Sequence, residues 1–392
     1  MNRSKLYSAY LLDNVIPFWL RHSLDLEFGG YYTCLERDGQ VYDTDKFVWL
    51  QGRGVWTFAM MYNQVEKKRE WLDAALLGAD FLLKNGRDKD GNWYFSLTRE
   101  GVPLQSAYNI FSDCFAAMAF AQLYKATANE EYAVVAKMTF ENILRRKDNP
   151  KGQYNKTIPR ARDLKGFSLP MILCNLVLEI EHLLDFDLVE NTLREGVDEV
   201  MNTFYKVELG IILENVSLDG SIVDSHEGRL INPGHGLEAM WFVMDIATRW
   251  KDKSLVDRCV EISLRLLSYG WDKEFGGIYY FRDLKGFPLL QLEWDQKLWW
   301  VHVEALVTCL KGYELTGNSQ LKRWYEVLHN YVWDHFVDQE HGEMFGYLDR
   351  RGDPLFTSKG GKWKGCFHVP RALYQLWITS VRIEEQGAVL SK

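Results

Sequence analysis

Apolar residues recur along this chain with the 3.6-residue period of α-helices, and the recurrence marks out twelve segments. The odd-numbered segments carry an apolar stripe on one side only. In segment 253–270, for example, the stripe runs from Val256 to Leu267 between charged positions. The alternate segments are apolar almost all round, as in 114–123. The twelve predicted helices are 4–21, 52–65, 70–86, 110–127, 130–147, 167–184, 187–205, 235–250, 253–270, 295–316, 318–337 and 366–384.

This alternation predicts an all-α fold with two layers of helices. A helix that is apolar on every face must be surrounded by protein, whereas a striped helix keeps one face in water. We therefore predict six helical hairpins arranged as an inner ring of six helices wrapped by an outer ring of six. No Pro-, Ser- or Gly-rich linker interrupts the pattern, which favours a single domain over residues 1–392.

Turn-rich segments follow several of the outer helices. They begin at Asp25, Asp88, Asp272 and Asp338. Each contains a Gly turn, a stretch rich in aromatic residues and a second Gly, which predicts a short β-hairpin in the loop.

Charge and cysteine content narrow the classes of partner and compartment. The net charge is −8 and no block of basic residues occurs, so we expect no nucleic-acid partner. The longest uncharged run, Gly166 to Leu178, is shorter than the ~20 apolar residues of a membrane helix, and we expect no membrane association. Asp13 interrupts the apolar N-terminal stretch, unlike a secretory signal. Six widely spaced cysteines indicate reduced core thiols of a cytoplasmic protein.

Aromatic residues are abundant, with 15 Trp, 20 Tyr and 21 Phe. Flat apolar faces with polar edges line cavities that bind amphipathic ligands such as sugars. Large cores also use aromatic residues, so this composition by itself leaves both interpretations open.

Charged residues and histidines on the apolar helices need a partner or a function, because burying an unpaired charge is costly. Most of them lie in or beside the first two helical turns. All inner helices of such a ring run in the same direction, so these residues converge on one mouth. His235 and Glu238 share a helix face, whereas His302 and Glu304 point to nearly opposite sides, so only one of the latter faces the lumen. The set comprises Arg53, Asp113, His235, Glu238, His302, Glu304, Lys364, His368 and Arg371.

Familiar catalytic motifs are missing from the sequence. No H-E-x-x-H, C-x-x-C or G-x-S-x-G pattern occurs, so zinc-protease, thiol-redox and serine-hydrolase functions lack their signatures. No complete set of metal ligands is apparent, and we predict no metal. The remaining chemistry is acid–base catalysis by histidine and carboxylate in an aromatic-lined cup.

Four runs of sequence strongly resemble the N-acylglucosamine 2-epimerase family, whose animal members are also called renin-binding proteins. They are RLINPGHGLEAMWF (229–242), FVWLQGRGVW (47–56), KLWWVHVEAL (297–306) and GGKWKGCFHVPRAL (360–373). The resemblance extends nearly end to end. It implies an (α/α)6 barrel of twelve helices, in agreement with the periodicity.

The resemblance also implies an activity and a set of site residues. The reaction is the reversible interconversion of N-acetyl-D-glucosamine and N-acetyl-D-mannosamine, which supplies a precursor of sialic acids. The family's catalytic histidines fall on His235 and His368. Its sugar-contacting positions fall on Arg53, Glu238, Glu304 and Arg371, with Trp363 and Lys364 as further candidates.

Partners and activators follow from the same resemblance. It implies a homodimer and an amino-sugar substrate, with no cofactor required for the chemistry. ATP is expected as an activator that is not consumed. The basic stretch 149–166 is a candidate nucleotide site, although a solvated loop explains it equally well.

The chemistry explains why such residues are needed. The C2 proton of the sugar becomes acidic only when C1 is a free aldehyde, so the ring must open first. Arg53 or Arg371 is suited to stabilise the negative charge that develops on the C1 oxygen. Two histidines flanking C2, one neutral and one protonated, return the proton to the opposite face. Glu238 would orient His235, and Glu304 would assist ring opening or hold a hydroxyl.

Other functions stay open at this point. An aldose–ketose isomerase or a cellobiose 2-epimerase would use the same scaffold and overlapping residues. A glycoside hydrolase of similar shape would need two carboxylates across a scissile bond. A non-catalytic protease-binding protein would keep the pocket only as a vestige.

Overall fold

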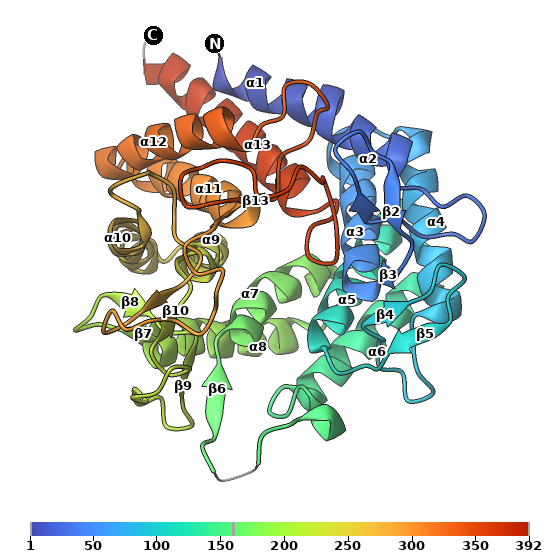
Figure 1. Ribbon diagram of the computed structural model, residues 1–392, viewed down its shortest axis with the longest axis horizontal. Helices are drawn as coiled ribbons and strands as arrows, with labels where there is room; N and C mark the ends of the chain where they lie inside the picture. The colour runs from blue at the N-terminus through green and yellow to red at the C-terminus, as the bar shows by residue number, and fades with distance from the viewer. Residues whose placement is uncertain (1, 159–160, 391–392) are drawn as a thin grey trace.

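The computed structural model describes residues 2–158 and 161–390, and this part of the chain forms a barrel of twelve helical rods (Figure 1). Six rods form an inner ring and six pack around it, which confirms the predicted all-α (α/α)6 barrel. The inner rods are α3 (Val48–Gln64), α5 (Ile110–Thr127), α7 (Ser168–Ile180), α9 (Pro233–Trp250), α11 (Trp299–Thr316) and α13 (His368–Leu390). The outer rods are α1 and α2 (Arg3–Tyr10 and Ile16–His22, joined by the π-helical turn Leu11–Val15), α4 (Arg69–Asn85), α6 (Glu130–Arg146), α8 (Phe186–Asp198), α10 (Lys253–Gly270) and α12 (Ser319–His335).

Helix boundaries differ from the predicted ones where the backbone geometry changes. The first rod widens into a π turn just before Pro17, which has no N–H to donate and whose ring crowds the carbonyl four residues earlier. Helix α7 ends in the 3₁₀ turn Glu181–Leu183, and α8 continues as the π turn Glu199–Phe204. The predicted helices run through these turns, because the period of the apolar residues does not distinguish a 3₁₀ or π turn from an α-helical one.

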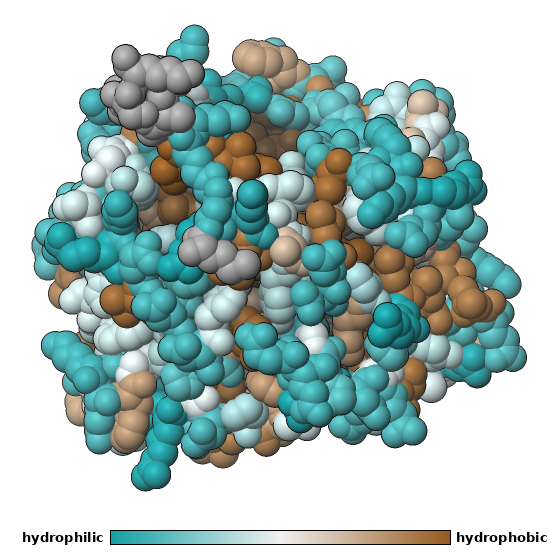
Figure 2. All heavy atoms as spheres, turned by 90° about the horizontal axis from the view of Figure 1, so that it is seen from above, coloured by the Kyte–Doolittle hydropathy of each residue, from teal (hydrophilic) through white to brown (hydrophobic). Residues whose placement is uncertain are grey.

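Burial follows the predicted division into two layers. In α5, nearly every residue from Ile110 to Leu123 is buried. In α10, the predicted apolar stripe from Val256 to Leu267 is buried, and the charged residues on the opposite face of the helix are exposed. Hydrophilic side chains accordingly cover most of the face in Figure 2, and hydrophobic ones show in separate groups. No helix in the described ranges is long and apolar enough to cross a bilayer.

The inner ring is continuous. Each inner helix packs against the next in chain order, from α3 through α5, α7, α9 and α11 to α13. The ring closes between α13 and α3, where the Thr57 hydroxyl donates to the Cys366 carbonyl at 2.7 Å and the rings of Trp56 and Phe367 meet at 5.2 Å.

One end of the barrel is closed by very short turns. Ala128, Lys251 and Gly317 end inner helices in the left-handed conformation, at φ of 55°, 57° and 68°. The next residue in each case is an Asn or Asp whose side chain caps the following outer helix. These two-residue turns place the long connections, and with them any binding site, at the opposite end.

Short antiparallel strands join the long connections at that open end. The strand before an inner helix pairs with the strand after the following outer helix, as β12 (Lys297–Leu298) does with β13 (Tyr347–Leu348). The same pattern joins β3 (Lys46–Phe47) to β4 (Ser96–Leu97), β6 (Leu164–Gly166) to β9 (Asn215–Ser217) and β10 (Leu230–Ile231) to β11 (Arg282–Asp283). Local pairs are β1 (Cys34–Leu35) with β2 (Val41–Asp43), β4 with β5 (Pro103–Gln105), and β7 (Tyr205–Lys206) with β8 (Ile211–Ile212).

The hairpin prediction is therefore confirmed in part. Hairpins form inside the segments that begin at Asp25 and Asp88. In the segment at Asp272 it is wrong, since the strand β11 pairs with β10 on the far side of a helical pair. In the segment at Asp338 the strand β13 likewise pairs with the distant β12, and a bridge between Leu348 and Pro354 forms within the segment. Periodicity along one segment cannot reveal a partner that is about fifty residues away.

Three buried ion groups fix the loops at the open end. The Asp272 carboxylate accepts from Lys297 Nζ at 3.1 Å and from Arg350 Nε at 2.9 Å. Burial alone would raise the pKa of Asp272, but the hydrogen bonds from Arg350 and Lys297 hold that pKa well below its usual value. Equivalent groups are Asp25 with Lys46 and Arg99, and Asp338 with Lys359 and Arg37.

Replacing Lys297 by Met should lower the free energy of unfolding by about 3 kcal/mol, because it leaves the buried Asp272 carboxylate with the partly exposed Arg350 as its remaining cationic partner. Urea denaturation followed by circular dichroism measures the change. Arg69→Met, which breaks an exposed pair with Asp73, is the control and should leave the midpoint unchanged. An unchanged midpoint for Lys297→Met would contradict a stabilising role.

Candidate active site

The N-terminal ends of the inner helices surround a cavity of about 1160 Å³ at the open end of the barrel. Its walls combine aromatic rings with charged side chains, as in many small-molecule sites. The predicted residues Arg53, His235, Glu238, Trp363 and His368 all line it.

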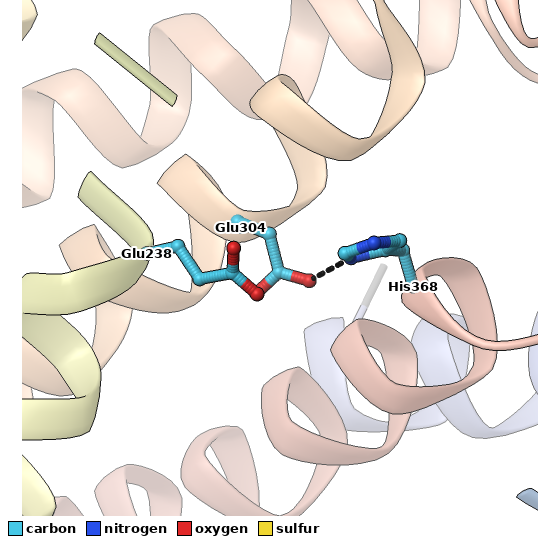
Figure 3. Close-up of side chains that lie close together, drawn as sticks. All are labelled: Glu238, Glu304 and His368. Carbon is cyan, nitrogen blue, oxygen red and sulfur yellow. Dashed lines mark hydrogen bonds and ion pairs between the residues drawn. The ribbon is translucent and has the colours of Figure 1, made fainter. Parts of the chain in front are cut away.

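His368 is held by a fully buried carboxylate. Its Nδ1 lies 2.8 Å from Glu304 Oε1, and the two side chains point toward one another from α13 and α11 (Figure 3). Glu304 also accepts from Trp241 Nε1 at 2.9 Å and from the Arg371 guanidinium at 2.7 Å. With three donors in place, Glu304 fixes the orientation of His368 and has little capacity left for a sugar hydroxyl.

His235 is held by a carboxylate that was not predicted from the sequence. Its Nδ1 lies 3.0 and 3.1 Å from the two oxygens of Glu214. Glu214 stands between β8 and β9, and its backbone is fixed by hydrogen bonds to Leu230 and Phe167. Glu214 therefore takes the orienting role that the sequence suggested for Glu238, which instead bonds Arg371. The signal in the sequence was an acidic residue directly after the apolar run 211–213.

Both imidazoles pack against one tryptophan. The Trp300 ring lies 5.1 Å from that of His235 and 5.8 Å from that of His368, at similar tilts of 35° and 36°. The centres of the two imidazole rings are therefore no farther apart than the sum of these two distances. Each Nδ1–H donates to a carboxylate, which leaves Nε2 as the basic nitrogen; neither Nε2 has a partner in the described ranges.

The surroundings shift the pKa values of the two histidines in opposite directions. Burial would lower the pKa of His235, but Glu214 and Glu238 outweigh it and raise that pKa above its usual value. For His368, burial and the positive charge of Arg53 lower the pKa well below its usual value. The surroundings therefore favour the protonated form of His235 and the neutral form of His368.

Arg53 is a buried guanidinium with no hydrogen-bond partner among the described residues. Aromatic rings surround it, with Phe115 at 4.0 Å and Trp49 at 4.4 Å. Burial and the charge of Arg371 lower the pKa of Arg53 to about 9, so it remains positive at neutral pH. An unpartnered cation facing a cavity is suited to bind a negative or developing negative oxygen.

Glu238, Glu304 and His368 form a cluster whose ligand-type atoms lie within 4.8 Å of one another (Figure 3). Such a cluster has the composition of a metal site. Here the Arg371 guanidinium bonds both carboxylates. It already supplies the positive charge that a divalent cation would bring.

Three other residues from the sequence prediction lie elsewhere. The Lys364 ammonium is buried in the wall, where it donates to Glu343 at 2.9 Å and to the Lys359 carbonyl at 2.7 Å, so it does not line the cavity. His302 donates to the Leu298 carbonyl and accepts from the backbone of β-bridged Ile278. Burial lowers the pKa of His302 to about 3, which keeps it neutral and structural.

Asp113 also turns away from the cavity. Its carboxylate accepts from Arg146 of α6 at 3.0 Å. On α11, Glu304 rather than His302 belongs to the site. Glu304 bonds His368 and Arg371 of α13, whereas the His302 ring stacks on Tyr331 of α12. Trp363 is half exposed at the mouth, with its ring edge-on to Trp49 at 5.5 Å.

Solved structures share this fold. A cellobiose 2-epimerase from Bacillus thermoamylovorans superimposes with a TM-score of 0.83 over 96% of this chain and 98% of the other, at 20% identity. This likeness confirms the helical-barrel fold of the chain.

The chain belongs to the N-acylglucosamine 2-epimerase family, whose sequence model matches residues 30–372. The N-acylglucosamine 2-epimerase of Bos taurus is 41% identical over 92% of this chain and 87% of its own length. The human protein of that name is 38% identical over 97% of this chain and 90% of its own. The chain is therefore a sugar epimerase.

Replacing Glu214 by Gln should lower the pKa of His235, because the charge that stabilises the imidazolium is removed. Histidine ring-proton NMR titration measures this directly and requires no substrate. Glu227→Gln is the matched control, since Glu227 is an exposed carboxylate of the same connection. A His235 titration that is the same in both variants would contradict the assignment.

Proposed function

We propose that this enzyme interconverts N-acetyl-D-glucosamine and N-acetyl-D-mannosamine by moving the proton at C2 of the ring-opened sugar. The observation that carries the proposal is the pair His235 and His368, each fixed by its own carboxylate beside Trp300. The names of the mammalian relatives support the choice of substrate.

The proton transfers follow from this arrangement. After the ring opens to the aldehyde, neutral His368 removes the C2 proton, and the resulting negative charge spreads to the C1 oxygen. Protonated His235 then delivers a proton to the other face of C2. The reverse reaction exchanges the two roles, so the overall proton count is unchanged. Hydrogen leaves and returns as a proton, so the reaction needs no redox partner.

Arg53 is the better candidate to stabilise the C1 oxygen. Its guanidinium has no hydrogen bond among the described residues, whereas Arg371 is engaged with Glu238 and Glu304. A donor that is already oriented and poorly hydrated stabilises developing charge without reorganisation. Arg371 acts through the carboxylates that it holds, as a positioning residue.

The same two carboxylates argue against glycoside hydrolysis. A hydrolase needs one free acid and one free base or nucleophile across a bond. Glu238 and Glu304 instead share the single Arg371 guanidinium. Aldose–ketose isomerisation remains a rival that the choice of substrate distinguishes.

We further propose, from the family resemblance, a cytoplasmic homodimer that ATP activates without being consumed. Within the candidate nucleotide stretch 149–166, Lys165 pairs with Glu199. Residues 159 and 160 of that stretch lie outside the described ranges.

Removal of either histidine should lower epimerisation by about 10²–10⁴-fold, because product formation requires both. In D2O, His235→Asn and His368→Asn should each still exchange the C2 proton of one epimer, and the two variants should exchange different epimers. Proton NMR of N-acetylmannosamine and N-acetylglucosamine measures both reactions.

Sugar affinity, measured by calorimetry on the same variants, separates lost binding from lost chemistry. A single variant that loses exchange from both sugars, while the other variant still epimerises, would contradict the two-base mechanism. Wild-type conversion of mannose to fructose in preference to any N-acetyl sugar would favour the isomerase.

Arg53→Lys should lower kcat by about 10²–10³-fold, since lysine keeps the charge but loses the planar fork of donors. Arg69→Lys on the exposed face of α4 is the control for the same chemical change. Steady-state kinetics with N-acetylmannosamine checks both, and wild-type turnover by Arg53→Lys would remove Arg53 from the oxyanion role.

A further inference from the structure

The cavity has two chemically different walls. The side formed by α9, α11 and α13 carries the histidines and Glu238. The side formed by α5 and α7 carries Phe111, Phe115, Met171 and Ile172, with a single hydroxyl from Ser168. The mechanism above uses none of the residues on this second wall except Phe115, which packs on Arg53.

The ring order of the helices decides which part of the substrate meets this wall. His235 on α9 and His368 on α13 flank Trp300 of α11, and α5 lies across the barrel from α11 (Figure 1). When C2 loses its proton it becomes planar, with one histidine facing each side of the plane. The substituents of C2 then lie in the plane, between the histidines, and one in-plane direction points at α5 and its neighbours.

Two contacts connect the edges of this wall to the residues of the proposed mechanism. The Phe115 ring lies 4.0 Å from the Arg53 guanidinium, which is assigned to the C1 oxygen. At the other edge, the Phe167 amide donates to the Glu214 carbonyl at 2.9 Å, and Glu214 holds His235. Ser168, the next residue, thus lies on the His235 side of the cavity. A substituent on C2, the carbon next to C1, therefore reaches the part of the wall that lies between these two edges.

The chemistry of this surface fits an acylamino group. Met171 and Ile172 are almost fully buried apolar side chains, suited to an alkyl group. The Ser168 hydroxyl is half-buried and has no hydrogen-bond partner in the described part of the chain, so it is available to an amide N–H or C=O. A C2 hydroxyl would leave the apolar part of the wall without a partner.

We propose that the wall formed by α5 and α7 is the subsite for the N-acyl group, an inference that rests on the proposed function. Met171 and Ile172 limit the length of the acyl chain, and Ser168 bonds its amide. The wall therefore determines which N-acylated hexosamines the enzyme accepts.

The test compares N-acetyl- with N-propanoylmannosamine, which differ by one methylene. In Ile172→Ala the kcat/KM ratio of propanoyl to acetyl substrate should rise at least about 10-fold over wild type, the usual effect of one methylene in a fitted apolar pocket. Ile172→Val, a milder change, should raise it less. Ser168→Ala should raise KM for both sugars and leave the ratio unchanged.

Leu173→Ala is the matched control, because Leu173 lies on the same helix and is buried to a similar degree but does not line the cavity. It should leave the ratio at the wild-type value. An unchanged ratio in both Ile172 variants, with active wild-type enzyme, would overturn the subsite. Failure of wild-type enzyme to epimerise any N-acyl sugar would instead overturn the proposed function.

Discussion

The buried ion pairs of Arg371 are the interaction on which the site depends. One guanidinium joins carboxylates from two other inner helices, Glu238 and Glu304, and Glu238 lines the cavity. Two buried carboxylates without this cation would repel one another in a medium of low dielectric constant. Because Glu304 also accepts from His368, the position of a reacting group is set by the same charges that join the three helices.

The neighbourhood of each histidine then determines its protonation. Both imidazoles donate Nδ1–H to a glutamate, yet their pKa values move in opposite directions. Glu238 raises the pKa of both histidines, but burial and the positive charges of Arg53 and Arg371 outweigh it at His368. The surroundings thus favour the acid form of one histidine and the base form of the other, the combination that moves a proton from one face of a carbon to the other.

Stability and chemistry are separated along the barrel axis. At one end, three connections are two-residue turns with left-handed caps. At the other end, long connections are tied down by strand pairs and by buried groups such as Asp272 with Lys297 and Arg350. These ties hold the loops around the mouth in place, so that a cavity lined by aromatic rings stays open between them.

The sequence by itself determined the twelve helices, their division into two layers and the end at which the polar residues gather. These properties follow from the period of the apolar positions and the direction of the chain, both of which are local. It also brought together Arg53, His235, Glu238, His368 and Arg371, since each lies near the start of an inner helix. Only the tertiary structure decided that Glu214 holds His235, that Lys364 faces the wall and that strands pair across helical hairpins. Those outcomes depend on the packing of residues far apart in the chain, and neither period nor spacing carries that information.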